Sequence, residues 1–378
     1  MKLYVLKKAS PTMIFLIFFS LILFDKTAWT AEAYYEEAPD VTAQSAVLMD
    51  GLTGQVLYDK NARERKPPAS TTKIMTALLA LEGGDLQKVV TISPGAASIG
   101  EASLDLKSGE KLTLEELIYG AMLESGNDAC VAIAEQIAGT EPNFVLLMNQ
   151  KAKLLGALET SFKNTNGLPQ AGHLTTARDL AIITRYALCN PTFKKVVSTK
   201  GRAIGNQGER FLNNTNRLLW SYEWADGVKT GTTNEAGYCL VASASREGRR
   251  LISVVLNSEN RWSDSIKLLN YGFENFESVR IVTKEEPYAK VLIKEGTGKE
   301  IQAVSSEEMF TVIPKGRQDI LEKKLAVCRE LDAPVRKGQQ VGCITVLVNG
   351  QSAGSVNLVS DREIERQSAL RLFFNKIM

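Results

Sequence analysis

The sequence predicts an α+β protein in which a cluster of helices packs on an antiparallel sheet and a small all-β domain follows. Three observations lead to this prediction. Apolar residues recur at helical spacing between residues 70 and 134, three β-rich runs follow one another over 227–257, and short β-rich runs separated by glycine and charged residues follow residue 276. The chain of 378 residues is long enough for two domains, which we place at 38–275 and 276–358.

The chain begins with a segment typical of a signal peptide. Three lysines precede an apolar run over 13–24, and Ala31-Glu32-Ala33 has the small residues of a cleavage site. Because the apolar run is short for a membrane span, we assign 1–33 to a cleaved signal peptide, with an uncleaved N-terminal anchor as the alternative. Its removal takes away four basic and two acidic residues and leaves 41 of each. With no net charge and no basic patch, the mature chain is not expected to bind nucleic acid.

The elements of the first domain follow from local patterns. Residues 46–50 and 55–58 predict a hairpin, and Thr113 to Glu116 form a capping box that opens a helix ending near Glu124. A helix of small residues is expected over 128–134. The runs over 227–257 predict an antiparallel meander, and a last helix contains Ile266, Leu268, Leu269, Tyr271 and Phe273.

The second domain and the tail complete the chain. Strands are expected at 279–282, 289–293, 308–313, 343–348 and 354–358. In the tail over 360–378, which also contains Ile364, four apolar residues recur at i, i+3, i+4 and i+7 among basic ones: Leu370, Phe373, Phe374 and Ile377. This pattern predicts an amphipathic helix that binds a membrane surface, with a helix docked on the protein or a frayed tail as the alternatives.

The stretch Ser70-Thr71-Thr72-Lys73 is the first candidate for chemistry. It follows two prolines and runs into an apolar stretch, which predicts a helix start with Ser70 at or near the N-cap. A spacing of three brings the Ser70 hydroxyl and the Lys73 amine to one face, where a neutral lysine can serve as the base for a serine nucleophile. Ser108 and Lys111 show the same spacing, but no apolar helical run follows them, so we interpret them as a polar turn.

Two further segments add to this candidate. Ser125-Gly126-Asn127 falls between two apolar helices, although such a tripeptide alone is typical of an ordinary turn. Lys229-Thr230-Gly231-Thr232 begins the meander, and a glycine on an edge strand allows a peptide-like ligand to lie alongside it.

In this chain order the three segments resemble the penicillin-recognising serine acyl-transferases. The middle segment, Ser125-Gly126-Asn127, resembles that of the D-alanyl-D-alanine carboxypeptidases, which are low-molecular-mass penicillin-binding proteins. The resemblance covers residues 40 to about 360 and includes 163–169 and 214–219. It implies a beta-lactamase/transpeptidase-like fold followed by a β-sandwich.

The resemblance also implies roles for individual residues. Ser70 attacks the penultimate D-alanine carbonyl of a peptidoglycan stem peptide, Lys73 takes its proton, and Ser125 relays a proton to the leaving amine. Asn127 holds the substrate backbone and Lys73. The terminal carboxylate meets Lys229 with the hydroxyls of Thr230 and Thr232 beside Gly231, and the N–H groups of Ser70 and Thr232 hold the oxyanion. Lys73 is expected to be neutral because of its burial and the nearby Lys229 charge.

The implied function is that of an exported carboxypeptidase, bound to the outer face of the cytoplasmic membrane and acylated by beta-lactams. One alternative is a class A-like beta-lactamase, but no E-x-x-L-N segment lies between Asn127 and Lys229 to supply its deacylating glutamate. The other is a non-catalytic beta-lactam-binding sensor, against which the three intact segments argue.

The remaining reactive residues predict no further chemistry. His173 is the only histidine, and no zinc-binding spacing surrounds it, so we expect a structural role for it and neither metal nor cofactor. Of the five cysteines, Cys130, Cys189 and Cys239 fall in apolar patterns and are expected to be buried free thiols. A pairing of Cys328 with Cys343 stays open.

Overall fold

The described chain forms two compact units. The computed structural model describes residues 2–6, 38–316, 320–368 and 371. One unit lies within Glu32–Asn275, and the other contains Phe276–Met378 and the N-terminal residues. Helices and an antiparallel sheet in the first unit, and a β-rich second unit with its own core, confirm the predicted fold class.

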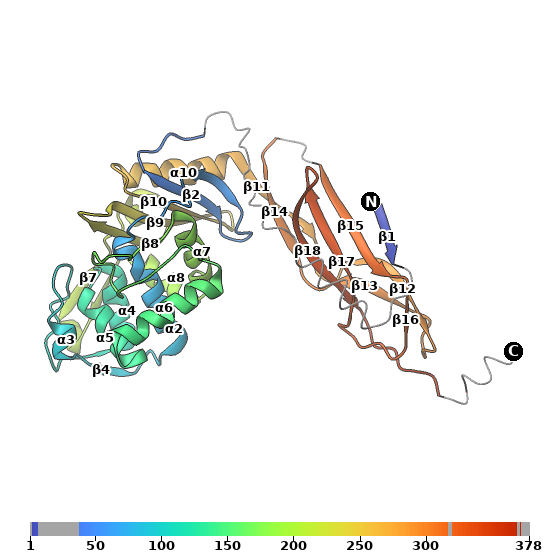
Figure 1. Ribbon diagram of the computed structural model, residues 1–378, viewed down its shortest axis with the longest axis horizontal. Coiled ribbons are helices and arrows are strands. Elements are labelled where there is room, and N and C mark those ends of the chain that lie inside the picture. Colours follow the sequence, from blue (N-terminus) through green and yellow to red (C-terminus); the bar gives the residue numbers. More distant parts are fainter. Residues whose placement is uncertain (1, 7–37, 317–319, 369–370, 372–378) are drawn as a thin grey trace. The chain divides into compact units, whose positions relative to one another are not determined.

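A five-stranded antiparallel sheet, in the order β3-β2-β10-β9-β8, forms the centre of the first unit. Its strands are β2 (Ser45–Asp50), β3 (Val56–Lys60), β8 (Ala225–Thr233), β9 (Gly237–Arg246) and β10 (Arg249–Leu256). Helix α10 (Arg261–Asn275) lies along one face, and the helical cluster lies on the other (Figure 1). Strand β8, which carries the Lys-Thr-Gly segment, is at one edge, as expected for the first strand of the meander.

Both faces of the central strands are buried, which explains their continuous apolar runs. Val47 and Ile252 belong to the core that the sheet shares with the helical cluster. Leu48 and Leu251 point to the opposite face, where they approach Gly272 of α10 so closely that an added Cβ would lie 2.7 and 2.6 Å from them. Burial of such side chains stabilises each by about 1.5–3 kcal/mol.

Local capping signals set many of the helix starts. Thr113 and Glu116 form the predicted capping box of α4 (Leu114–Leu123), which ends beside Glu124 as expected. Thr140, Thr176 and Asn190 cap later helices with their side chains. The other elements of this unit are η1 (Ala69–Thr72), α2 (Lys73–Gly83), β4 (Val89–Thr91), α3 (Pro94–Ala97), β5 (Lys111–Thr113), α5 (Asn127–Ala138), α6 (Glu141–Leu155), α7 (Ala177–Ala187), α8 (Pro191–Ser198), β6 (Gly201–Ile204), η2 (Asn206–Gly208), β7 (Arg210–Asn213) and α9 (Leu218–Ser221).

The second unit has a mixed sheet in the order β1-β15-β17-β18-β13-β12-β16 and a two-stranded sheet of β11 and β14. Its strands are β11 (Phe276–Val282), β12 (Pro287–Lys294), β13 (Glu300–Ser305), β14 (Met309–Pro314), β15 (Leu321–Cys328), β16 (Glu330–Asp332), β17 (Gln340–Val348) and β18 (Gln351–Ser360). The segment β1 (Lys2–Leu6) pairs in parallel with β15. The apolar run of the expected signal peptide, over 13–24, lies outside the described residues.

Four strands of this unit were not predicted, and one of them, β1, falls within the expected signal peptide. Strand β13 mixes apolar with charged and polar residues, β15 begins with Leu321 and three charged residues, and β16 has only three residues, so none of them begins as an apolar run. Cys328 and Cys343 lie on the paired strands β15 and β17, and both are free thiols. Cys189 is exposed, which corrects its expected burial, while Cys130 and Cys239 are buried as predicted.

The predicted tail helix is wrong at its beginning. Residues 361–368 form no helix, and Ile364 exchanges backbone hydrogen bonds of 2.9 and 2.8 Å with Val335. The Ile364 side chain is buried in the core of the second unit, where it approaches Gly296 and Gly298. Packing therefore holds this stretch against the strands. The four periodic apolar residues from Leu370 to Ile377 lie outside the described residues.

Candidate active site

Ser70 lies in the short 3-10 helix η1, which we call the Ser70 turn, directly before α2. It is close to the start of the helix as predicted, but its side chain does not cap it. Ala69 has a positive φ of 48°, an uncommon conformation for a residue with a Cβ. An added Cβ on Gly231 of β8 would lie 3.1 Å from the Ser70 nitrogen, so the close approach of the protein's own turn favours glycine there.

Lys73 is fully buried and meets three oxygen atoms. Its Nζ lies 2.9 Å from Ser70 Oγ, 2.8 Å from Asn127 Oδ1 and 2.7 Å from the Asn166 carbonyl oxygen. Burial lowers the pKa of Lys73 from 10.5 to about 8, against the opposing effect of Cys130, Asp128 and Glu101. A substantial fraction of the amine is therefore neutral near pH 8, as a general base requires.

Ser125 lies between α4 and α5, and Asn127 is the first residue of α5. Ser125 has a φ of 70°, and among the residues that the structure describes its buried Oγ has no hydrogen-bond partner. Asn127 begins α5 and, besides contacting Lys73, donates from Nδ2 to the Gly100 carbonyl at 3.1 Å. The backbone of Ser125 is thus strained, and its hydroxyl lies near the Asn127 amide, which is anchored by hydrogen bonds on both sides.

The strand β8 supplies the other side of the site. Lys229 is 1% exposed, and its Nζ has no hydrogen-bond partner within the described part of the chain. Burial and the neighbouring Lys73 lower its pKa well below 10.5. An amine that is buried without an acceptor is suited to receive an anionic ligand. Thr230, two-thirds of the way along β8, shares a 2.8 Å hydrogen bond with the Thr215 hydroxyl.

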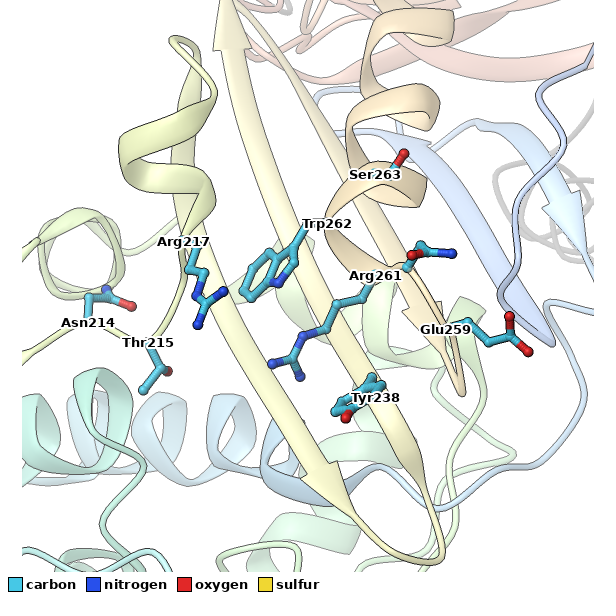
Figure 2. Close-up of a pocket in the computed structure, with 9 residues that line it drawn as sticks. Asn214, Thr215, Arg217, Tyr238, Glu259, Arg261, Trp262 and Ser263 are labelled. Atoms are coloured by element: carbon cyan, nitrogen blue, oxygen red, sulfur yellow. The ribbon is translucent and has the colours of Figure 1, made fainter.

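Arg261, at the start of α10, extends over the outer side of this strand. Its Nη1 donates to the Gly231 carbonyl at 3.0 Å and to Thr232 Oγ1 at 2.9 Å. Figure 2 shows the guanidinium between the rings of Tyr238 and Trp262, whose centroids lie 5.2 and 4.7 Å from it. These residues line a cavity of about 700 Å³, whose lining also includes Thr215, the hydrogen-bond partner of Thr230.

Comparison with known proteins identifies the family. A family profile described as D-alanyl-D-alanine carboxypeptidase matches residues 32–260. The chain belongs to this family of serine peptidases. A second profile, the C-terminal domain of penicillin-binding protein 5, matches residues 276–366. The predicted family and enzyme class are therefore confirmed.

Individual relatives match over most of their length. The D-alanyl-D-alanine carboxypeptidase DacF of Bacillus subtilis is 39% identical over 320 residues, which cover 82% of each chain. DacC of Escherichia coli is 36% identical and covers 91% of this chain and 90% of its own. Among solved structures, penicillin-binding protein 5 from Haemophilus influenzae superposes with a TM-score of 0.77 at 32% identity, covering 88% of this chain and all of that one.

Two groups that face the family's site were missed by the sequence reasoning. The Asn166 carbonyl accepts from Lys73, and a backbone group leaves no signal in the residue types. Arg261 lies 30 residues beyond Gly231 and reaches it only because α10 folds back along the sheet. The decoy pair Ser108 and Lys111, by contrast, is exposed in a turn at the start of β5, as predicted.

Proposed function

We propose that this chain is an exported carboxypeptidase that removes the terminal D-alanine from peptidoglycan stem pentapeptides through an acyl-enzyme on Ser70. The observation that carries the proposal is the 2.9 Å contact between Ser70 Oγ and the buried Lys73 Nζ. Since burial lowers the pKa of that amine to about 8, it can accept the proton of a serine hydroxyl.

The surroundings of Lys73 support its role as the base. A neutral amine has two hydrogens to donate and one lone pair. It can therefore donate to Asn127 Oδ1 and the Asn166 carbonyl while its lone pair faces the Ser70 hydroxyl. In the acylation step the Ser70 proton passes to Lys73, Oγ bonds to the penultimate D-alanine carbonyl carbon, and the carbonyl oxygen becomes an oxyanion held by the N–H groups of Ser70 and Thr232.

Collapse of this intermediate breaks the peptide bond and needs a proton on the leaving nitrogen. Ser125 relays that proton from the Lys73 ammonium to the D-alanine amine, a role supported by its unpaired, buried Oγ. The acyl group then remains as an ester on Ser70. Water, activated by the neutral Lys73, hydrolyses the ester and restores the enzyme.

The terminal carboxylate is proposed to bind at β8, against Lys229 and the hydroxyls of Thr230 and Thr232. The buried Lys229 amine, which has no hydrogen-bond partner among the described residues, supports this assignment, and Arg261 adds a second positive charge beside Thr232. A bound carboxylate favours the charged form of Lys229, which in turn disfavours a charge on Lys73. Substrate binding thereby helps to keep the base neutral.

Beta-lactams are proposed to acylate Ser70 by the same attack, since their strained amide imitates the D-alanyl-D-alanine bond. The protein is proposed to act outside the cytoplasm after cleavage of residues 1–33. We also propose that a domain over 38–275 carries out catalysis and that a domain over 276–358 provides a partner surface. The apolar residues after 368 are proposed to contact a membrane. No helix among the described residues is long and apolar enough to cross a membrane.

The test uses purified residues 34–378 with diacetyl-lysyl-D-alanyl-D-alanine and follows the release of D-alanine. We expect release by the wild type and none by Ser70→Ala. Absence of release together with rapid turnover of penicillin would favour a beta-lactamase. A stable penicillin adduct without peptide hydrolysis would favour a sensor.

A further inference from the structure

His173, which the proposed reaction does not use, is buried between two parts of the active site. It lies in the segment before α7 and is 3% exposed. Its Nδ1 accepts a hydrogen bond of 3.1 Å from the Lys163 backbone N–H, and its Nε2 lies 2.9 Å from Thr72 Oγ1. The Phe162 ring and the imidazole pack in a T-shaped arrangement at a centroid distance of 5.8 Å. The ring thus connects the 163–168 segment with the Ser70 turn.

These contacts determine the tautomer of His173. Because Nδ1 accepts from a backbone N–H, it carries no proton, and a neutral ring must then carry its hydrogen on Nε2. The single hydrogen of the Thr72 hydroxyl is donated to the Ala69 carbonyl at 2.8 Å. The Thr72 oxygen is therefore an acceptor for His173 Nε2–H, and the hydrogen bonds run in one direction, from the Lys163 N–H to the Ala69 oxygen.

The end of this chain is the peptide group that joins Ala69 to Ser70. A trans peptide is planar, so its C=O and N–H point in opposite directions. Because the Thr72 hydroxyl holds the Ala69 oxygen, the Ser70 N–H must point away from Thr72. The hydrogen bond therefore fixes the direction of this N–H. The orientation needs support because Ala69 has a positive φ of 48°.

The 163–168 segment presses on the same peptide. The Gly167 Cα lies so close to it that an added Cβ would be 1.8 Å from the Ala69 oxygen and 2.9 Å from the Ser70 nitrogen. His173 holds the beginning of that segment through the Lys163 N–H, and the Asn166 carbonyl in its middle contacts Lys73. One imidazole therefore supports the Ser70 peptide from Thr72 and from the segment packed on it.

We propose that His173 is a positioning residue for the oxyanion hole, acting through Thr72 and the Ala69 carbonyl to aim the Ser70 N–H at the substrate carbonyl oxygen. This inference rests on the proposed function, in which that N–H is an oxyanion donor. Its consequence is selective: loss of the imidazole should weaken binding of the tetrahedral species and leave binding of the ground-state peptide nearly unchanged.

The experiment compares His173→Phe, which keeps a planar ring without hydrogen-bonding groups, with His173→Gln, whose amide offers one donor and one acceptor. Thr72→Val removes the hydroxyl, and Thr72→Ser is its matched control because it keeps the hydroxyl. For each full-length protein, kcat and KM for D-alanine release are measured. The inhibition constant of a peptide boronic acid, whose adduct with Ser70 places an oxygen in the oxyanion hole, is measured alongside. Thermal unfolding checks that each variant is folded.

We expect His173→Phe and Thr72→Val to lower kcat about 10- to 100-fold with little change in KM, and to weaken the boronate by a similar factor. His173→Gln and Thr72→Ser should keep most of the kcat and boronate affinity that His173→Phe and Thr72→Val lose. In the Thr72→Val background, His173→Phe should lower kcat by a smaller factor than it does in the wild type, because only its support of the 163–168 segment is then left to lose. An active wild type with an unchanged kcat in folded His173→Phe would overturn the inference, as would equal losses of boronate and substrate affinity. An inactive wild type would instead refute the proposed function.

Discussion

Replacing Gly167 with alanine is expected to displace the Ser70 turn. Gly167 has a φ of 92°, and a Cβ added there would lie 1.8 Å from the Ala69 oxygen, 2.3 Å from the Ala69 carbonyl carbon and 2.9 Å from the Ser70 nitrogen. Ordinary contacts begin at 3.4 Å, so the two backbones must separate by about 1.6 Å. The obstructing atoms are backbone atoms and cannot turn away as a flexible side chain does.

Two costs follow from this geometry. A left-handed φ costs a residue with a Cβ about 1–2 kcal/mol, and separation of the two segments adds to the loss in the free energy of unfolding. A misplacement of about 1 Å can reduce the rate of an enzyme by about 100-fold, so we expect kcat for D-alanine release to fall by at least that factor. KM should change less, because the proposed carboxylate contacts come from the side chains of β8 and not from the Ser70 turn.

Gly156→Ala is the matched control for this experiment. Gly156 has a φ of 84° at the end of α6, but nothing lies within 4 Å of its added Cβ. The control should therefore lose about 1 kcal/mol of unfolding free energy and keep its activity. The assay is D-alanine release per folded enzyme, with urea unfolding of both variants. Wild-type kcat in a folded Gly167→Ala protein would refute the idea that close packing on the Ala69–Ser70 peptide sets the reactive geometry.

Three further predictions follow from the charges of the buried groups. Because burial lowers the pKa of Lys73 to about 8 and only its neutral form is a base, kcat/KM should rise with pH through a midpoint near 8, and a rate independent of pH between 6 and 9 would contradict this role. Lys229→Met should reduce kcat/KM about 10- to 100-fold for a substrate with a free carboxylate, since a charge-assisted hydrogen bond contributes about 1.5–3 kcal/mol. The loss should be much smaller for the C-terminal amide of the same peptide. Equal losses for both substrates would count against carboxylate binding by Lys229. Burial, with the nearby Lys163, lowers the pKa of His173 from 6.5 to about 4, so the unfolded chain binds more protons than the folded chain between these pH values. The free energy of unfolding should therefore decrease by about 3 kcal/mol as the pH falls through that range. His173→Gln should remove this part of the pH dependence, and parallel curves of stability against pH for the two proteins would contradict the prediction.

Local patterns predicted the elements whose signals lie within a few residues. The capping box of Thr113 and Glu116 gave the start of α4, and the apolar runs after Lys229 gave the meander with its first strand at the sheet edge. The pairing of Ser70 with Lys73 followed from helical spacing, and their atoms are 2.9 Å apart. In each case the deciding interaction joins residues that are close together in the sequence.

The features that were missed depend on contacts between distant segments. Ala69 has a positive φ, and Gly167 and Gly231 pack on the Ser70 turn, which no local pattern reports. Arg261 reaches β8 from the start of α10. The periodicity of the residues after Ile364 placed it in an amphipathic helix. In the structure its backbone is hydrogen-bonded to the distant Val335 instead.

The most direct test of the account is the mass of the protein after reaction with benzylpenicillin at neutral pH, followed by peptide mapping. We expect a single penicilloyl adduct on the peptide that contains Ser70, formed quickly by the wild type, absent from Ser70→Ala and strongly slowed in Lys73→Ala. An adduct on another residue, or a Lys73→Ala protein that is acylated as fast as the wild type, would contradict the claim that Ser70 is the nucleophile and Lys73 its base.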